Sequence, residues 1–166
     1  MRKVAILGIG QIPIGEHWEK SIRHLAGDAV TAAIAEAHIE PTVIESLYVG
    51  NMLSGALNKQ ENVSALIADW VGLRGIEASK IEAACGSGAA AFRSGLMAVA
   101  SGVNDLVLVV GVEKMTETGG TNTTSHLASA ADADYEAAQG LSFVALNALI
   151  MRRYLHEFGW KHNDFA

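Results

Sequence analysis

Apolar residues recur along the chain either as short continuous runs or as stripes with a helical period. Continuous runs of strand length occupy residues 4–9, 46–50 and 106–112, and a shorter run, 81–84, ends directly before Cys85. A run without alternation is typical of a strand that is buried on both faces of a sheet. The pattern therefore predicts four strands.

Amphipathic segments separate these runs. Residues 21–39 and 63–71 each carry an apolar stripe of helical period, with Gly72 placed as the C-terminal cap of the second, and 89–101 is an alanine-rich helical segment. Parallel strands need crossover connections, whose helices pack on the sheet. We therefore expect an α/β fold with helices on both faces of a mostly parallel sheet, and a core of βαβαβαβ order over residues 1–117.

The sequence changes character after Glu117. Residues 118–140 are rich in Gly, Thr, Ser, Ala and Asp and show no strand period, which predicts a mobile, irregular excursion. Residues 142–158 again carry one apolar stripe and predict an amphipathic helix. We treat 118–166 as a second region.

Composition narrows the possible functions. Half of the 166 residues are hydrophobic, 18% are charged and the net charge is −6, which argues against a nucleic-acid partner. No segment approaches the roughly 20 apolar residues that a membrane span needs. A single cysteine cannot form an intrachain disulfide, so we expect a cytoplasmic protein.

Cys85 is therefore a candidate for reactivity. It lies where a strand is predicted to lead into a helix, and the free N–H groups and dipole of a helix start favour the thiolate form that acts as a nucleophile. Gly86 and Gly88 allow tight backbone geometry, and the Cys85 N–H could donate to a developing oxyanion. The alternative is that Cys85 packs as a small apolar residue among alanines. The local pattern does not decide between the two.

Residues 82–91, E-A-A-C-G-S-G-A-A-A, resemble the nucleophile motif of the thiolases, which combines Cys-x-Ser with small residues. Residues 49–51 and 111–116 are similar to the Gly-Asn and Gly-x-Glu-x-Met segments of that family, and 153–159 to the stretch where a thiolase returns from its loop region. The resemblance covers essentially the whole chain. It implies the N-terminal half of a thiolase of the archaeal or sterol-carrier-like branch, with 118–166 contributing to the loop domain.

The family implies an acyltransferase that performs a Claisen condensation of two acyl-CoA molecules, or the reverse thiolysis, through an acyl thioester on Cys85. Ser87, Met115 and His126 are then expected to contact the substrate, and no cofactor or metal is expected besides coenzyme A as substrate. The catalytic base would come from a C-terminal thiolase half in the same or another chain. A dimer or tetramer is expected, with a role in lipid or isoprenoid precursor metabolism.

Other interpretations stay open. The chain could be a non-catalytic thiolase-like subunit, or a relative of the ketoacyl synthases or hydroxymethylglutaryl-CoA synthases. The glycines of residues 8–15 do not form a dinucleotide fingerprint, because Pro13 stands where that motif needs a small residue. The six histidines show no metal-ligand spacing. Glu113 and Lys114 are interpreted as a structural ion pair.

Overall fold

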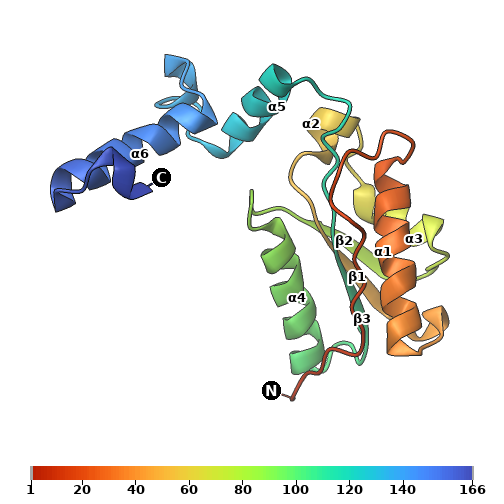
Figure 1. The fold of residues 1–166 in the computed structure, drawn as a ribbon. Coiled ribbons are helices and arrows are strands. Elements are labelled where there is room, and N and C mark those ends of the chain that lie inside the picture. The colour runs from red at the N-terminus through yellow and green to blue at the C-terminus, as the bar shows by residue number, and fades with distance from the viewer. Residues whose placement is uncertain (1, 166) are drawn as a thin grey trace. The chain divides into compact units, whose positions relative to one another are not determined.

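The structure is a computed structural model that describes residues 2–165. The chain divides into two compact units, Met1–Glu117 and Thr118–Ala166, called unit 1 and unit 2 below (Figure 1). Each unit is described by itself.

Unit 1 is built on a parallel sheet of three strands in the order β2-β1-β3. The strands are β1 (Ser46–Gly50), β2 (Glu77–Ile81) and β3 (Val107–Gly111). Gly50 lies opposite Ile81 on one side and opposite Gly111 on the other. All three strands therefore end at the same edge of the sheet, where the loops that follow them meet.

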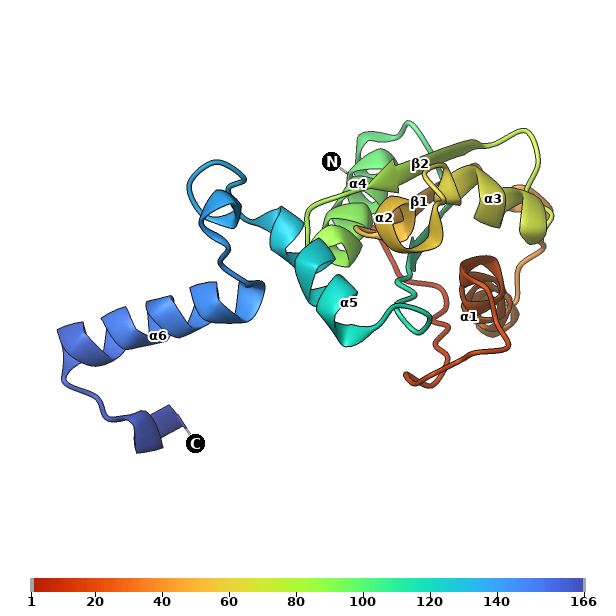
Figure 2. The same cartoon turned by 90° about the horizontal axis from the view of Figure 1, so that it is seen from above.

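Helices cover both faces of this sheet, which confirms the predicted fold class (Figure 2). One face is covered by α4 (Ser87–Ser101), and the other by α3 (Val63–Trp70) with α1 (Ile22–Ala37) packed against it. A short helix that the sequence pattern did not predict, α2 (Ser54–Asn58), follows β1. The predicted helices begin or end within about two residues of the observed ones.

The core of unit 1 lies between the sheet and the α1–α3 layer. Leu47 and Val49 of β1 and Val63 and Ile67 of α3 are completely buried, and Val30 of α1 joins the same cluster. These side chains come from the apolar positions that the periodicity identified. Burial of this kind is the main favourable contribution to folding.

Two strand predictions are wrong. Residues 4–9 form no strand, because their backbone pairs with no other strand, although they run alongside α1 and β3. The strand predicted at 81–84 instead spans Glu77–Ile81, and residues 82–86 form the turn into α4. The prediction at 106–112 is confirmed as β3, but most of its residues are only partly buried, because one of its edges is open.

Unit 2 contains α5 (Gly120–Leu127), α6 (Phe143–Phe158) and short 3-10 turns. The prediction of an irregular segment at 118–140 is therefore wrong for the residues of α5. The sequence of α5 is rich in Gly and Thr, which have low helix propensity, and it has no apolar stripe that would have indicated a helix. The helix predicted at 142–158 is confirmed as α6. Ser142 begins it by accepting a hydrogen bond from the Ala145 N–H (3.1 Å), and Gly159 ends it with a φ of 68°. No helix within residues 2–165 is both long and apolar enough to cross a bilayer.

Candidate active site

The end of β1 is held close to the start of α4. A side chain at Gly50 would put its Cβ 2.5 Å from the Ser87 carbonyl oxygen and 2.7 Å from the Gly88 Cα, so only glycine permits this approach. The first turn of α4 therefore packs directly on the carboxyl edge of the sheet. In open α/β sheets this edge is where ligands bind.

Cys85 lies on a tight turn between β2 and α4 and is exposed. The turn is closed by two backbone hydrogen bonds, from the Gly86 N–H to the Ala83 carbonyl (2.9 Å) and from the Ser87 N–H to the Ala84 carbonyl (3.1 Å). Ala84, immediately before the cysteine, has a φ of 48°. A left-handed conformation at a residue with a side chain costs of order 1–3 kcal/mol, and such strain tends to occur at functional sites.

The hydroxyl of Ser87 holds this strained turn. It accepts a hydrogen bond from the Ala83 N–H (2.9 Å) and donates one to the Ala84 carbonyl (2.7 Å), and the residue is buried. Its only proton is thus used within the turn that presents Cys85. The sequence predicted Ser87 as a substrate contact, and that role stays a prediction.

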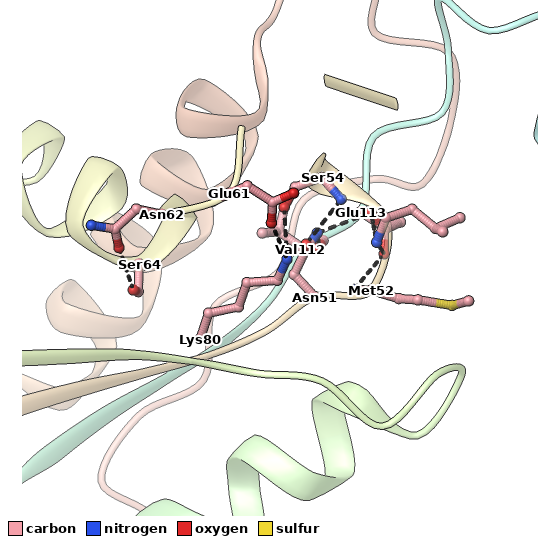
Figure 3. A network of polar contacts seen from close by, with 10 residues as sticks. Asn51, Met52, Ser54, Glu61, Asn62, Ser64, Lys80, Val112 and Glu113 are labelled. Carbon is pink, nitrogen blue, oxygen red and sulfur yellow. Dashed lines mark hydrogen bonds and ion pairs between the residues drawn. The ribbon is translucent and has the colours of Figure 1, made fainter. Parts of the chain in front are cut away.

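A polar network ties together the three strand ends (Figure 3). The side-chain amide of Asn51, which directly follows β1, donates to the Val112 carbonyl (2.8 Å) and to the Glu113 carboxylate (2.9 Å), and its oxygen accepts from the Ser54 N–H (3.1 Å). The Asn51 backbone N–H donates to the Ile81 carbonyl at the end of β2 (3.2 Å). Asn51 is 1% exposed, so each of its polar groups relies on these protein partners for its hydrogen bonds.

Glu113 completes the network from the loop after β3. Besides Asn51, its carboxylate accepts hydrogen bonds from the backbone N–H groups of Met52 (3.0 Å) and Leu53 (3.2 Å) (Figure 3). The carboxylate thus fixes the chain that leaves β1. The sequence analysis missed this role, because it depends on β1 and β3 being neighbours in the sheet, which the sequence alone does not specify.

The interpretation of Glu113 and Lys114 as an ion pair is wrong, because the two side chains bind different partners. The Lys114 ammonium is buried and donates to the His17 carbonyl (2.9 Å) and to the Glu117 carboxylate (2.8 Å). The hydrogen bond from Lys114 lowers the pKa of Glu117 below its usual value of 4.5, against a smaller opposing effect of burial. Lys114 therefore anchors the segment after β3.

The other two predicted substrate contacts lie apart in the chain. Met115 follows Lys114 in unit 1 and is exposed. His126 lies in the last turn of α5 in unit 2, and its carbonyl accepts a hydrogen bond from the Ser129 hydroxyl (2.7 Å). Both roles stay predictions. Within residues 2–165, no group of three or more His, Cys, Asp and Glu side chains is placed to hold a metal ion.

Residues 4–157 match the family model described as the N-terminal domain of thiolase. The chain belongs to the thiolase family. It is 44% identical over its whole length to an acetyl-CoA acetyltransferase of Methanothermobacter thermautotrophicus, of which it covers 43%. It is 45% identical over 96% of its length to an acetyl-CoA acetyltransferase of Methanocaldococcus jannaschii, of which it covers 40%.

A solved structure is also similar to this chain. The Ltp2-ChsH2(DUF35) aldolase matches 97% of this chain and 40% of its own with a TM-score of 0.70 and 26% identity. This thiolase chain thus spans less than half the length of each of these three relatives.

Proposed function

We propose that this chain carries the acyl-accepting nucleophile of a thiolase-type acetyltransferase, and that Cys85 is that nucleophile. The observation that carries the proposal is the exposed Cys85 on a strained, clamped turn at the carboxyl edge of a parallel sheet. The two relatives at 44% and 45% identity are acetyl-CoA acetyltransferases, which supports acetyl-CoA as the substrate.

In the proposed first step, the Cys85 thiolate attacks the carbonyl carbon of acetyl-CoA and forms a new carbon–sulfur bond. Negative charge develops on the carbonyl oxygen, where the Cys85 N–H and the N-terminal dipole of α4 can stabilise it. When the carbonyl re-forms, the bond to the CoA sulfur breaks and CoA leaves as a thiolate that then takes up a proton. The product is an acetyl thioester on Cys85.

In the proposed second step, a base removes an α-proton from another acetyl-CoA, and the resulting carbanion attacks the acetyl-Cys85 carbonyl. Acetoacetyl-CoA forms and the Cys85 thiolate is released; thiolysis is the same sequence in reverse. We assign the base to the part of a thiolase that this chain does not span. Met115 and His126 remain our candidates for contacts to the acyl-CoA, and assembly into dimers or tetramers remains a prediction.

The half-reaction tests this assignment without the second step. When the chain is incubated with acetyl-CoA and isotopically labelled CoA, we expect label to appear in acetyl-CoA, because acyl transfer to Cys85 is reversible. The Cys85→Ala variant should show no exchange while keeping the circular dichroism spectrum of the parent. Equal exchange in both proteins would contradict the proposal.

A non-catalytic thiolase-like subunit is the alternative to this function. It predicts no exchange in either protein, although both are folded. A ketoacyl synthase or hydroxymethylglutaryl-CoA synthase relative would still acylate Cys85, and would differ in the second substrate. The identities of 44% and 45% to acetyl-CoA acetyltransferases support the acetyltransferase function over these alternatives.

A further inference from the structure

The turn that carries Cys85 is supported on both of its sides by the residues at the end of β1. On the side of β2, the Asn51 N–H donates to the carbonyl of Ile81, the last residue of that strand (3.2 Å). On the side of α4, Gly50 packs so closely on Ser87 that a Cβ would lie 2.5 Å from its carbonyl oxygen. Two consecutive residues therefore contact the chain before and after the cysteine. A shift of the end of β1 would move the turn with it.

Glu113 fixes the path of the chain at this point (Figure 3). Its carboxylate accepts hydrogen bonds from the side-chain amide of Asn51 (2.9 Å) and from the backbone N–H groups of Met52 (3.0 Å) and Leu53 (3.2 Å), the three residues that follow β1. Among residues 2–165, Glu113 forms no ion pair, so it is N–H groups that bind its charge. Hydrogen bonds to an ionised group are roughly twice as strong as those between neutral groups. One charged side chain thus holds all three residues.

The backbone on each side of Glu113 is itself anchored. The Val112 N–H donates to the Gly50 carbonyl (3.2 Å), and the Val112 carbonyl accepts from the side chain of Asn51 (2.8 Å). On the other side, Lys114 is buried and its ammonium makes two contacts with the surrounding chain. The carboxylate is therefore held in a defined position, from which it can orient the end of β1.

We propose that Glu113 is a positioning residue for Cys85. By holding Asn51 and the chain after β1, it keeps the cysteine turn in the place and orientation that acyl transfer requires. This inference rests on the proposed role of Cys85 as the nucleophile. Attack on a thioester needs sulfur, carbonyl carbon and oxyanion donor to be aligned, and a misplacement of about 1 Å can lower such a rate about 100-fold. Alkylation of the thiol by a small reagent does not need this alignment.

The surroundings of Glu113 make the effect separable from a loss of the core. Glu113 is exposed, so Glu113→Gln empties no buried space. The amide and the carboxylate have the same shape, but the amide has one acceptor oxygen and an NH2 group. Asn51 and Met52 donate to different oxygens of the carboxylate. In the variant one of these two donors must therefore face the NH2 group and lose its hydrogen bond.

Two rates measured on the full chain test the proposal. One is the exchange of labelled CoA into acetyl-CoA, and the other is the alkylation of Cys85 by iodoacetamide. Glu113→Gln should lower the exchange rate about tenfold or more and change the alkylation rate by less than about twofold. An unchanged exchange rate, or equal losses in the two rates, would overturn the proposal.

Glu117→Gln is the matched control. It removes a carboxylate from the same loop, but that carboxylate contacts Lys114 (2.8 Å) and not the end of β1. The variant should lose some stability and keep both rates. If Glu117→Gln lowered the exchange rate as much as Glu113→Gln, a general loosening of the loop would explain the effect, and the specific role of Glu113 would be refuted.

NMR distinguishes a failure of this inference from a failure of the proposed function. If the parent chain shows no exchange at all, the assignment of Cys85 as the nucleophile fails, but the link from Glu113 to the turn is still measurable. The backbone amide signals of Ala84, Cys85 and Gly86 should shift in Glu113→Gln and stay in place in Glu117→Gln. Signals from the turn that are the same in Glu113→Gln and the parent would overturn the proposal.

Discussion

Unit 1 and unit 2 differ in whether they bury their own apolar side chains. Unit 1 has a core of completely buried residues on β1 and α3, whereas no residue of 118–165 is buried. Large apolar side chains of unit 2, including Val144, Ile150 and Phe158, are more than 60% exposed. Its internal packing includes an aromatic contact between Tyr154 and Phe158, with ring centroids 4.7 Å apart.

This difference separates two kinds of amphipathic helix. In α3, the apolar stripe meets the sheet of its own unit, and the strand ends that it supports carry Cys85 and the Asn51 network. In α6, a stripe of the same period is left without a covering surface in unit 2. A helix of this length is marginal without tertiary packing, so the stability of the chain should come from unit 1.

The largest expected effect comes from truncating one isoleucine in each unit. Ile67 of α3 is completely buried and Ile150 of α6 is 68% exposed. Ile67→Ala should lower the free energy of unfolding by about 2–5 kcal/mol, and Ile150→Ala should change it by no more than about 0.5 kcal/mol. Urea denaturation followed by circular dichroism gives both values. Similar losses of unfolding free energy in the two variants would show that α6 of unit 2 contributes to the core as α3 does.

A matched pair of asparagines gives the next largest effect. Asn51→Ala removes three side-chain hydrogen bonds and leaves the Val112 carbonyl and the Ser54 N–H without partners, which should cost about 1–3 kcal/mol. Asn147 in α6 is exposed and donates to the Phe143 carbonyl of its own helix. Asn147→Ala should be neutral in the same urea experiment. If Asn51→Ala left the free energy of unfolding unchanged, the Asn51 network would not stabilise unit 1.

The serine clamp should show a smaller effect on stability and a larger one on reactivity. Ser87→Ala should cost about 1 kcal/mol and slow acetylation of Cys85, because Ala84 loses the bonds that hold its positive φ. Ala84→Gly should restore the rate in the double variant, since glycine adopts this φ without strain. Ser129→Ala, at an exposed hydroxyl in unit 2, is the control. If Ala84→Gly did not restore the acetylation rate of the Ser87→Ala variant, Ser87 would not position Cys85 through Ala84.

The smallest effect concerns the pH dependence of unit 1. Lys114 lowers the pKa of Glu117, so the pair adds stability that is fully present above the usual carboxyl value of 4.5 and is lost as the pH falls through the lowered pKa of Glu117 in the folded chain. Glu117→Gln should therefore reduce the urea midpoint more at about pH 6 than at about pH 3. Glu157→Gln in α6 is the control: it removes an exposed ion pair with Arg153 (2.6 Å) in a unit without buried residues, and should leave both midpoints nearly unchanged. If Glu117→Gln lowered the urea midpoint equally at both pH values, the lowered pKa of Glu117 would not be the cause.

The sequence predicted those parts of the fold that depend on local pattern. The apolar runs predicted β1 and β3, the apolar stripes predicted α1, α3 and α6, and the alanine-rich segment predicted α4. Residues 4–9 have an equally apolar run, but strand formation depends on a pairing partner that the run itself cannot reveal. The positive φ of Ala84 could not be predicted either, because alanine has no preference for this conformation. The helix α5 was missed because its sequence has no apolar stripe.

Part of the candidate site could be proposed from the sequence as well. Cys85 became a candidate through its position before a helix and through the family motif, because both signals are local. The hydrogen bond that joins Asn51 to Glu113 connects residues 62 positions apart, so it depends on strand order. The sequence alone does not specify that β1 lies between β2 and β3. The pairing of Lys114 with Glu117 instead of Glu113 likewise depends on the direction in which the chain leaves β3.

The most direct measurement is the location of the acetyl group after this chain has reacted with acetyl-CoA. Peptide mapping by mass spectrometry should find a hydroxylamine-sensitive acetyl thioester on Cys85 in unit 1. The Cys85→Ser variant should lack any thioester. Acetyl groups confined to lysine side chains, or a chain that stays unmodified while folded, would contradict the assignment of Cys85 as the acyl-accepting nucleophile.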